Sequence, residues 1–322
     1  MKGLQIAAVA GHAPSPLERL VDDYFISCAA RGLSPRTIEN CYSQSLRRIF
    51  LPWCEQERIT DVAQLDRRTL DRFTTELLSR EGRYGKPLSR HTVHAYVGPV
   101  RLFLTWAERE GEEVKAKPQF PKLPVLYKQA LSRDEIERME LAASAERDKI
   151  IVRLFADCGL RLSELLTLQP GNIIRSGRQA MLAIHGKGCR DRRVPVPPAL
   201  LRRLDRFIAG LPADRESDRI FLSLRRGPFG YYEPLTDSGI KQLVRDAAIR
   251  AGIGRTVHPH LLRHSWMTEM LRRRVVPSQL RVVAGASPEV ISRHYDHVTE
   301  DDAYEAVIRA LAAPDQRRRE VP

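Results

Sequence analysis

A proline-rich segment near the middle divides this chain into two parts that we expect to fold separately. Pro118, Pro121 and Pro124 recur every three residues after Lys115. Proline lacks a backbone N–H and interrupts helices and sheets, so the segment favours an extended chain. A length of 322 residues also agrees with about two domains. We predict a disordered leader over 1–14, a first domain over 15–117, a linker over 118–128, a second domain over 129–313 and a basic tail over 314–322.

The first domain is predicted to be a small bundle of four principal helices. Apolar residues recur at helical spacing in successive stretches of this region. Helix N-cap residues stand before three of these stretches, at Ser34, Asp66 and Ser89. Gly98 and Pro99 lie inside the last stretch, which predicts a kinked helix.

The second domain is predicted to combine helices with two short strands. Ser132 and Glu135 form a capping box that opens one helix. The strands are expected over 181–185 and 193–196, with a glycine-containing turn between them. Further helices are expected over 200–208, 237–249 and about 301–312. One helix is expected to end at Gly159, and others are expected to begin at Ser163 and at His258. A short helix is expected to lead from Ser287 to Tyr295.

The stretch His258–His264 places two chemically useful side chains on one face of a helix. Pro259 suits the first helical turn, where its missing N–H costs nothing. His260 and Arg263 lie three residues apart and therefore share a face. Arginine can bind a phosphate with two parallel N–H bonds, and histidine can donate or accept a proton near neutral pH. The same spacing also suits a structural or solvated pair. Whether the pair binds phosphate depends on whether the rest of the chain supplies a nucleophile and more cations.

Two further segments bring cations into the second domain. Arg161 stands just before a predicted helix, and Glu164 lies in the first turn of that helix. A surface arginine with a structural glutamate partner would show the same pattern. In the turn between the strands, glycines flank Lys187 and allow it to approach a ligand closely. This turn lacks the glycine and lysine spacing of a phosphate-binding loop, so it does not imply ATP.

The charge of the chain indicates a polyanionic partner. The 53 lysines and arginines exceed the 40 aspartates and glutamates, which gives a net charge of +13. Both halves, 1–128 and 129–322, carry part of this excess, as two domains that hold one nucleic acid would require. A basic protein without such a partner is the alternative. The candidate DNA contacts are Arg36, Arg47, Lys86, Arg90, Arg190, Arg192 and Arg193.

In combination, these segments resemble the tyrosine recombinase (phage integrase, Xer-like) family. The matching motifs are Gly-Leu-Arg-x-Ser-Glu-Leu at 159–165, Gly-Lys-Gly-x-Arg-x-Arg-x-Val-Pro at 186–195, His-x-x-Arg-His at 260–264, and Tyr295. They occur in the family's order, and the resemblance covers nearly the whole chain. It implies an N-terminal all-α, SAM-like core-binding bundle. It also implies a C-terminal mixed α/β catalytic domain with the DNA breaking-rejoining fold.

The resemblance also implies a site-specific DNA recombinase that works through a 3′-phosphotyrosine bond. Tyr295 would be the nucleophile, and Arg161 and Arg263 would hold the non-bridging phosphate oxygens. Lys187 would protonate the leaving 5′-oxygen, and His260 would assist as acid or base. Supporting roles around these groups fall to Glu164, His264 and His294. Because the phosphotyrosine bond stores the energy of the phosphodiester, we expect neither a cofactor nor a metal ion.

One position departs from the family pattern. Family members usually carry His or Trp where this chain has Ala286. A methyl group cannot donate a hydrogen bond to phosphate, so we expect slower cleavage unless His294 or His297 supplies the donor. Two alternatives remain open at this point. One is a catalytically impaired relic that only binds DNA, and the other is an enzyme that resembles a type IB topoisomerase or a telomere resolvase.

The expected partners and location follow from the resemblance and from composition. The resemblance implies double-stranded DNA and a homotetramer on two recombination sites, with an accessory DNA-bending protein or partner recombinase, for integration, excision or resolution of mobile DNA. Five cysteines without a Cys-x-x-Cys pair indicate reduced thiols in a cytosolic protein. The apolar run Ile6–Ala10 is too short for a signal peptide or a membrane span. We therefore predict a cytoplasmic, nucleoid-associated protein that does not bind membranes.

Overall fold

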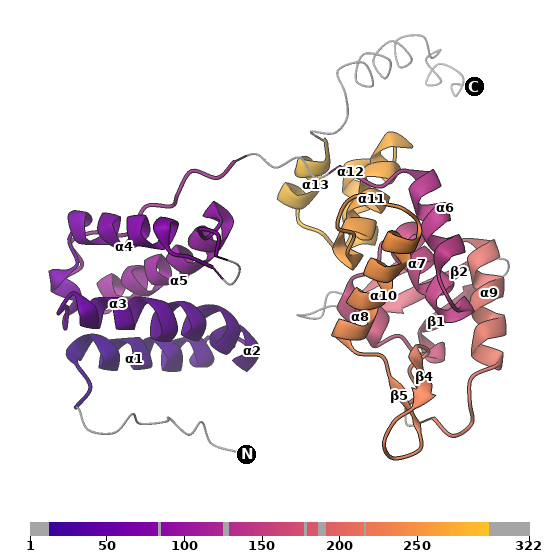
Figure 1. Cartoon of the computed structure of the whole chain (residues 1–322), viewed down its shortest axis with the longest axis horizontal. Coiled ribbons are helices and arrows are strands. Elements are labelled where there is room, and N and C mark those ends of the chain that lie inside the picture. The colour runs from indigo at the N-terminus through magenta and orange to yellow at the C-terminus, as the bar shows by residue number, and fades with distance from the viewer. Residues whose placement is uncertain are drawn as a thin grey trace, which may run out of the picture. The chain divides into compact units, whose positions relative to one another are not determined.

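The chain forms two compact units that divide between Leu126 and Tyr127 (Figure 1). The computed structural model describes residues 13–82, 85–124, 129–176, 179–185, 191–215 and 217–295, with the backbone alone for 293–295. The predicted helix over 301–312 and the basic tail lie outside these residues, as does most of the leader. Each unit has its own hydrophobic core.

Helices build the first unit. Its elements are α1 (Pro16–Ala30), α2 (Pro35–Thr37), the π-helical segments η1 (Ile38–Ser43) and η2 (Leu46–Phe50), α3 (Leu51–Gln56), the 3-10 turn η3 (Val62–Gln64), α4 (Arg67–Ser79) and α5 (Arg90–Arg109). The predicted N-caps are confirmed, because the side chains of Ser34, Asp66 and Ser89 each accept a backbone N–H from the first turn of a helix. Side-chain caps at Ser15 and Asp61 were not predicted.

The second predicted helix differs from a regular α-helix. Between Ile38 and Phe50 much of the backbone follows the wider π-helical hydrogen-bonding pattern. Pro52 follows directly and lacks the N–H that a regular helix would donate to residue 48. The sequence periodicity did not reveal this, because an apolar face survives a locally wider turn. In contrast, α5 continues through Gly98 and Pro99 as one helix, and the kink stays a prediction.

The first residues of the predicted linker pack against the first unit. The Arg101 guanidinium on α5 donates a hydrogen bond of 2.9 Å to the Pro118 carbonyl and lies over the Phe120 ring. The same ring stacks on His94, with 4.2 Å between the ring centroids. The start of the predicted linker thus has no regular secondary structure and lies along α5.

Helices and two small sheets build the second unit. Its elements are α6 (Arg133–Ala142), α7 (Glu146–Cys158), α8 (Leu162–Leu166), η4 (Pro170–Asn172), β1 (Ile173–Ser176), β2 (Gln179–Ile184), β3 (Arg192–Pro195), α9 (Pro198–Ala209), β4 (Leu222–Arg226), β5 (Tyr232–Pro234), α10 (Asp237–Arg250), α11 (Pro259–Arg272), α12 (Pro277–Ala284) and α13 (Pro288–Tyr295). The two predicted strands correspond to β2 and β3. The sequence did not predict β1, β4, β5 or α12, which are all short.

In the described residues, the larger sheet is antiparallel with the order β1-β2-β3. In its register, Leu182 pairs with Val194 and Ile184 pairs with Arg192. Side chains alternate between the faces of a strand, so Arg192 shares the buried face of β3 with Val194. Arg193 points to the exposed face. This alternation gives two neighbouring arginines different environments.

Helix α11 runs through the core of the second unit (Figure 1). Its beginning is as predicted, because Pro259 occupies the first turn and His258 Nδ1 accepts the Leu261 N–H at 3.1 Å. The helix packs against α7, α12 and α13. Trp266 lies so close to Gly159, the left-handed residue that ends α7, that a Cβ there would come within 2.1 Å of the indole. This close approach brings the end of α7 to α11.

The N-cap of α8 differs from the prediction. Ser163 lies inside the helix, and Arg161 occupies the N-cap position. The Glu164 carboxylate explains this shift, since it accepts the backbone N–H of Arg161 at 2.7 Å and so satisfies a donor at the helix start. The short helix therefore begins with both of these charged residues fixed to each other. In the part of the chain that the structure describes, no helix has the length and apolarity needed to cross a membrane.

Candidate active site

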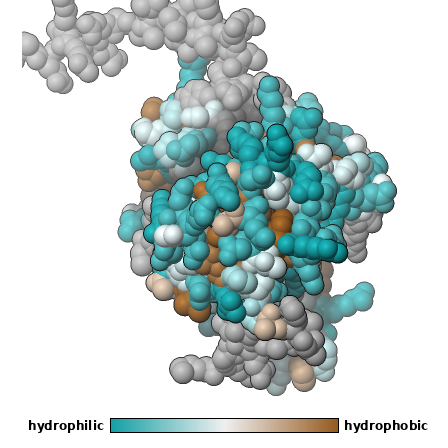
Figure 2. Space-filling model, turned by 90° about the vertical axis from the view of Figure 1, so that its left-hand side faces the viewer, coloured by the Kyte–Doolittle hydropathy of each residue, from teal (hydrophilic) through white to brown (hydrophobic). Residues whose placement is uncertain are grey.

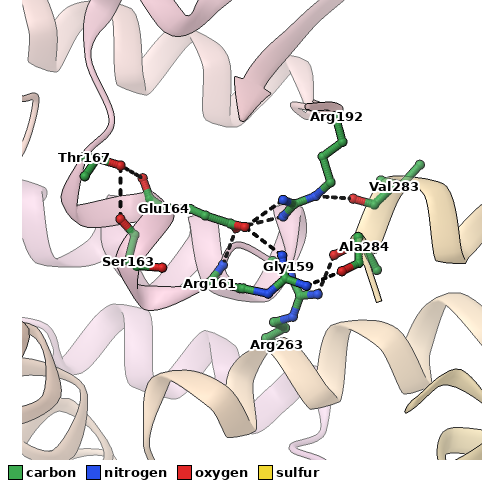
Figure 3. A network of polar contacts seen from close by, with 10 residues as sticks. Gly159, Arg161, Ser163, Glu164, Thr167, Arg192, Arg263, Val283 and Ala284 are labelled. Carbon is green, nitrogen blue, oxygen red and sulfur yellow. Dashed lines mark hydrogen bonds and ion pairs between the residues drawn. The ribbon is translucent and has the colours of Figure 1, made fainter. Parts of the chain in front are cut away.

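Glu164 is the centre of a buried polar network in the second unit (Figure 3). Arg192 NH1 and NH2 donate to its two carboxylate oxygens at 2.6 and 2.7 Å. Arg161 donates through its backbone N–H at 2.7 Å and through NH1 at 2.8 Å. A carboxylate that accepts bonds from two arginines is held in one orientation, and it holds both arginines in turn.

The charges in this network favour an ionised glutamate. Burial alone would raise the pKa of Glu164. The hydrogen bonds from Arg192 and from the Arg161 backbone outweigh burial and lower this pKa from 4.5 to about 2. Glu164 is therefore negatively charged at neutral pH.

Three arginines also meet the end of α12. Arg192 Nε donates to the Val283 carbonyl at 2.8 Å, Arg263 NH2 donates to the Ala284 carbonyl at 2.5 Å, and Arg161 NH2 donates to the Gly285 carbonyl. The last carbonyls of a helix have no partner within the helix and carry partial negative charge. Cations from β3, α11 and the start of α8 thus satisfy successive carbonyls of one helix end.

Arg263 is the most deeply buried of these cations, with 3% of its surface exposed. It also donates NH1 to the Gly159 carbonyl. Burial, and next the positive charge of Arg161, lower the pKa of Arg263 from 12.5 to about 10. The guanidinium is still charged at neutral pH, and it is repelled by the positive charges of Arg161 and Arg192. One carboxylate does not balance Arg161, Arg192 and Arg263, so the site favours an added anion.

The histidines of α11 occupy different depths. His260 is exposed in the first turn, three residues before the buried Arg263. Its ring is nearly parallel to that of His258, with 6.4 Å between the ring centroids. His264 is buried in the body of the helix. The predicted shared face of His260 and Arg263 therefore extends from the surface to the arginine cluster.

The structure brings some of the predicted site residues together and leaves others outside its description. Arg161, Glu164 and Arg263 converge at the starts of α8 and α11. Tyr295 ends α13 and follows His294, and the structure describes only the backbone of both. Lys187, Arg190 and His297 lie outside the described residues. The roles of these residues stay predictions.

Ala286 lies next to the arginine cluster. It follows Gly285, whose left-handed backbone (φ 59°) ends α12, and it packs against the small hydrophobic cluster that contains Trp266, Leu280 and Ile291. A Cβ at position 285 would lie 3.0 Å from Arg192 Cδ. The chain thus passes close to the arginines between α12 and α13.

The predicted DNA contacts fall into different environments. Arg192 is buried rather than exposed, with 5% of its side chain accessible, and its donors serve Glu164 and Val283, so its predicted contact with DNA stays a prediction. Arg47 is half-buried, pairs with Asp22 and lies over a phenylalanine ring. Arg90 is exposed, and its side chain donates to a backbone carbonyl. Arg36, Lys86 and Arg193 are exposed.

The sequence contained a signal for the buried position of Arg192 that motif matching missed. Arg192 stands directly before the strand predicted over 193–196 and two residues before Val194, and residues two apart in a strand share a face. An arginine in phase with a buried valine is expected to point inward with a partner.

Comparison with known proteins identifies the family. The phage integrase family matches residues 129–301, which is more than half of the chain. The chain belongs to this family. The tyrosine recombinase XerD of Caulobacter vibrioides is 30% identical over 74% of the chain and 79% of its own length. The tyrosine recombinase XerC 2 of Ralstonia nicotianae is 28% identical over 88% of the chain and 82% of its own length.

Solved structures of other recombinases share the fold of this family member. The Tn1549 transposon integrase in complex with transposon right end DNA has a TM-score of 0.67 at 17% identity, over 91% of this chain and 99% of that one. The XerH recombinase in its pre-cleavage complex with the difH substrate has a TM-score of 0.63 at 19% identity, over 89% and 83%. These similarities confirm the predicted tyrosine recombinase fold class.

The described residues of this family member offer no cluster of three or more His, Cys, Asp and Glu side chains that could hold a metal ion. The charged groups that converge in the site are mainly the guanidinium groups of Arg161, Arg192 and Arg263. Hydrogen bonds to Glu164 and to the end of α12 hold these groups in place.

Proposed function

We propose that this chain is a site-specific recombinase that cuts and rejoins DNA strands through a phosphotyrosine intermediate at Tyr295. The observation that carries the proposal is the convergence of Arg161 and Arg263, from α8 and α11, in a site with excess positive charge (Figure 3). Phosphoryl transfer concentrates negative charge on the non-bridging oxygens, and fixed cations in a buried site stabilise that charge.

Each proposed role follows from the chemistry of one step. The Tyr295 oxygen attacks phosphorus, the bond to the 5′-oxygen breaks, and a 3′-phosphotyrosine forms. Lys187 gives a proton to the leaving 5′-oxygen, while His260 assists proton transfer at the exposed start of α11. Rejoining reverses these steps, with a 5′-hydroxyl as the nucleophile.

Phosphate binding would require Arg161 and Arg263 to exchange partners. Both guanidinium groups now donate NH2 to carbonyls at the end of α12. A phosphate oxygen is charged and accepts stronger hydrogen bonds than a neutral carbonyl. We therefore expect DNA to draw these donors from Ala284 and Gly285, and to loosen the turn that precedes α13.

The proposed partner is double-stranded DNA. Exposed cations such as Arg36 and Lys86 in the first unit, and Arg193 in the second, would contact phosphates. The face of the first unit that Figure 2 shows is largely hydrophilic. We further propose a homotetramer on two DNA sites, assisted by a DNA-bending protein or a partner recombinase. The proposed location is the nucleoid in the cytoplasm, and the proposed task is integration, excision or resolution of mobile DNA.

A covalent adduct tests the function directly. A library of random duplexes with a nick near the centre would be incubated with the protein, and covalently bound DNA would be recovered after denaturation. The parent is expected to form an adduct, and Tyr295→Phe is expected to bind DNA without forming one. DNA binding by the parent with no adduct would instead support the DNA-binding relic. Relaxation of a plasmid without recombinant products would support a topoisomerase-like enzyme.

A further inference from the structure

Arg192 and Arg193 are neighbours on β3 but meet opposite environments. Arg193 points to solvent, whereas 5% of the Arg192 side chain is exposed. The resemblance to the family assigns a role to Arg161, Lys187 and Arg263 but none to this buried arginine.

The bonds of Arg192 connect parts of the active site that are distant in sequence. Its NH1 and NH2 groups grip both oxygens of Glu164 on α8, and its Nε donates to the Val283 carbonyl on α12. The same carboxylate also accepts hydrogen bonds from the Arg161 backbone N–H and from the Arg161 guanidinium. A bidentate pair fixes direction as well as distance, so the plane of the Arg192 guanidinium sets the plane of the Glu164 carboxylate.

We propose that Arg192 is a positioning residue that fixes the Arg161 guanidinium and the end of α12 relative to each other. The catalytic consequence rests on the proposed recombinase function. Through Glu164, Arg192 holds the first phosphate-binding arginine. Through Val283, it holds the helix end from which Gly285–Ser287 leads into α13, the helix that ends at Tyr295.

Energetics favour a positioning role over simple stabilisation. Both partners of the Arg192–Glu164 pair lose hydration on burial, and a pair of well-packed apolar side chains can be equally stable. What apolar residues cannot supply is direction. Lysine also cannot replace the arginine, because an ammonium is a point charge without the planar fork that spans both oxygens.

The first arm of the test compares the two neighbours on β3. Arg192→Lys and Arg192→Met are measured beside the matched controls Arg193→Lys and Arg193→Met. The probe is a nicked duplex recovered from the random library by adduct formation with the parent. At saturating protein, both Arg192 variants are expected to cleave roughly a hundredfold more slowly, since a small misplacement of reacting groups has an effect of this size. Their dissociation constants for DNA should stay within about twofold of the parent.

The Arg193 controls should show the opposite pattern. Removing an exposed cation weakens phosphate contacts, so Arg193→Met should bind DNA more weakly, and its cleavage rate at saturating protein should stay well above that of Arg192→Met. A loss of affinity and cleavage in parallel in both Arg192 variants would overturn the proposal in favour of a DNA contact. Cleavage by Arg192→Lys at the parent rate would also overturn it.

The second arm needs no DNA and therefore separates this proposal from the proposed function. Glu164 is labelled with ¹³C at its carboxyl carbon, assigned by the loss of its signal in Glu164→Gln, and titrated in the folded protein. The charged groups that face it are Arg161, Arg192 and Arg263. In the parent, the carboxylate should stay ionised down to the lowest pH at which the protein is folded.

In Arg192→Lys the Glu164 signal should titrate at a higher pH, and in Arg193→Lys it should not change. An unchanged Glu164 titration in Arg192→Lys would show that the pair does not set the state of the carboxylate and would overturn the proposal. Absence of an adduct from the parent, with the expected titration shift, would refute the recombinase function and leave the positioning of Arg161 intact. Lysine keeps the charge and most of the volume, so this variant decides the test if Arg192→Met does not fold.

Discussion

The arginines of the two units use the same guanidinium group in different ways. In the first unit, Arg47 pairs with Asp22 and lies over the Phe25 ring, with 37% of its side chain exposed. In the second unit, Arg192 and Arg263 are buried, and each donates to backbone carbonyls from distant segments. The first arrangement ties neighbouring helices at the surface. The second uses charge to organise a site in the interior.

This difference shows that burial decides what a cation does in this protein. A surface ion pair contributes about 0 to 1 kcal/mol, because water and salt screen both charges. Removing one partner of a buried pair costs roughly 3 to 5 kcal/mol, because the other charge stays behind without hydration. Matched substitutions, one in the interior and one at the surface, therefore test whether burial distinguishes the two kinds of arginine.

The largest contrast is expected between Arg263→Met and Arg47→Met. Loss of Arg263 removes a cation that would stabilise the phosphoryl-transfer transition state, and we expect cleavage to fall by roughly a thousandfold. Arg47→Met should change the cleavage rate at saturating protein by less than about threefold. Adduct formation in a single turnover measures both rates. Equal losses in the two variants would mean that burial does not distinguish the arginines.

A smaller effect on cleavage is expected for His260→Ala. General acid or base assistance contributes about a hundredfold or more, so cleavage should fall by about that factor while DNA affinity is nearly unchanged. His94→Ala in the first unit removes a ring that stacks on Phe120 and serves as the control. A mild cleavage defect in His260→Ala, similar to the control, would contradict a chemical role at this position.

Stability gives the third contrast, between Glu164→Gln and Glu39→Gln. Glu164→Gln leaves buried Arg192 without its charged partner, so the free energy of unfolding should fall by roughly 3 kcal/mol. Glu39 pairs with Arg48 at 3.6 Å on the surface, and its loss should cost less than about 0.5 kcal/mol. Urea unfolding followed by circular dichroism compares the two. Equal costs would contradict the inferred strength of the buried network.

The pH dependence of stability follows from the same glutamate. Its pKa is about 2 in the folded protein, against an ordinary value of 4.5 that applies to the unfolded chain. A lowered carboxyl pKa contributes stability that is fully present above about 4.5 and is lost as the pH falls through about 2. The parent should therefore lose more stability than Glu164→Gln between pH 5 and pH 2. Thermal unfolding at several pH values measures this difference, and parallel curves would contradict it.

The smallest effect is expected for single exposed cations of the first unit. Arg36→Met should lower the slope of log affinity against log salt by about one, without changing cleavage at saturation. Binding measured at several salt concentrations tests this. A loss of cleavage at saturation would place Arg36 in a role that its exposed position on α2 does not suggest.

Local patterns predicted much of the fold correctly. Caps at Ser34, Asp66, Ser89 and Ser132 marked helix starts, because each cap bonds to backbone only three residues away. The turn at Gly159 was also recognisable, since a left-handed residue after an apolar run ends a helix. The short elements β4, β5 and α12 were missed, because a few residues give too few repeats for a period to be seen.

The amino-acid sequence was enough to recognise the family, the order of its motifs and the types of residue proposed to carry the chemistry. The use of each of those residues depends on contacts that form only in the folded chain. Arg192 and Arg193 are identical in type and adjacent in the chain, yet one grips Glu164 and the other faces solvent. Arg192 is buried because β3, α8 and α12, which are distant in the sequence, pack together in the folded chain. Only then do Glu164 and the carbonyls at the end of α12 lie within reach of its guanidinium.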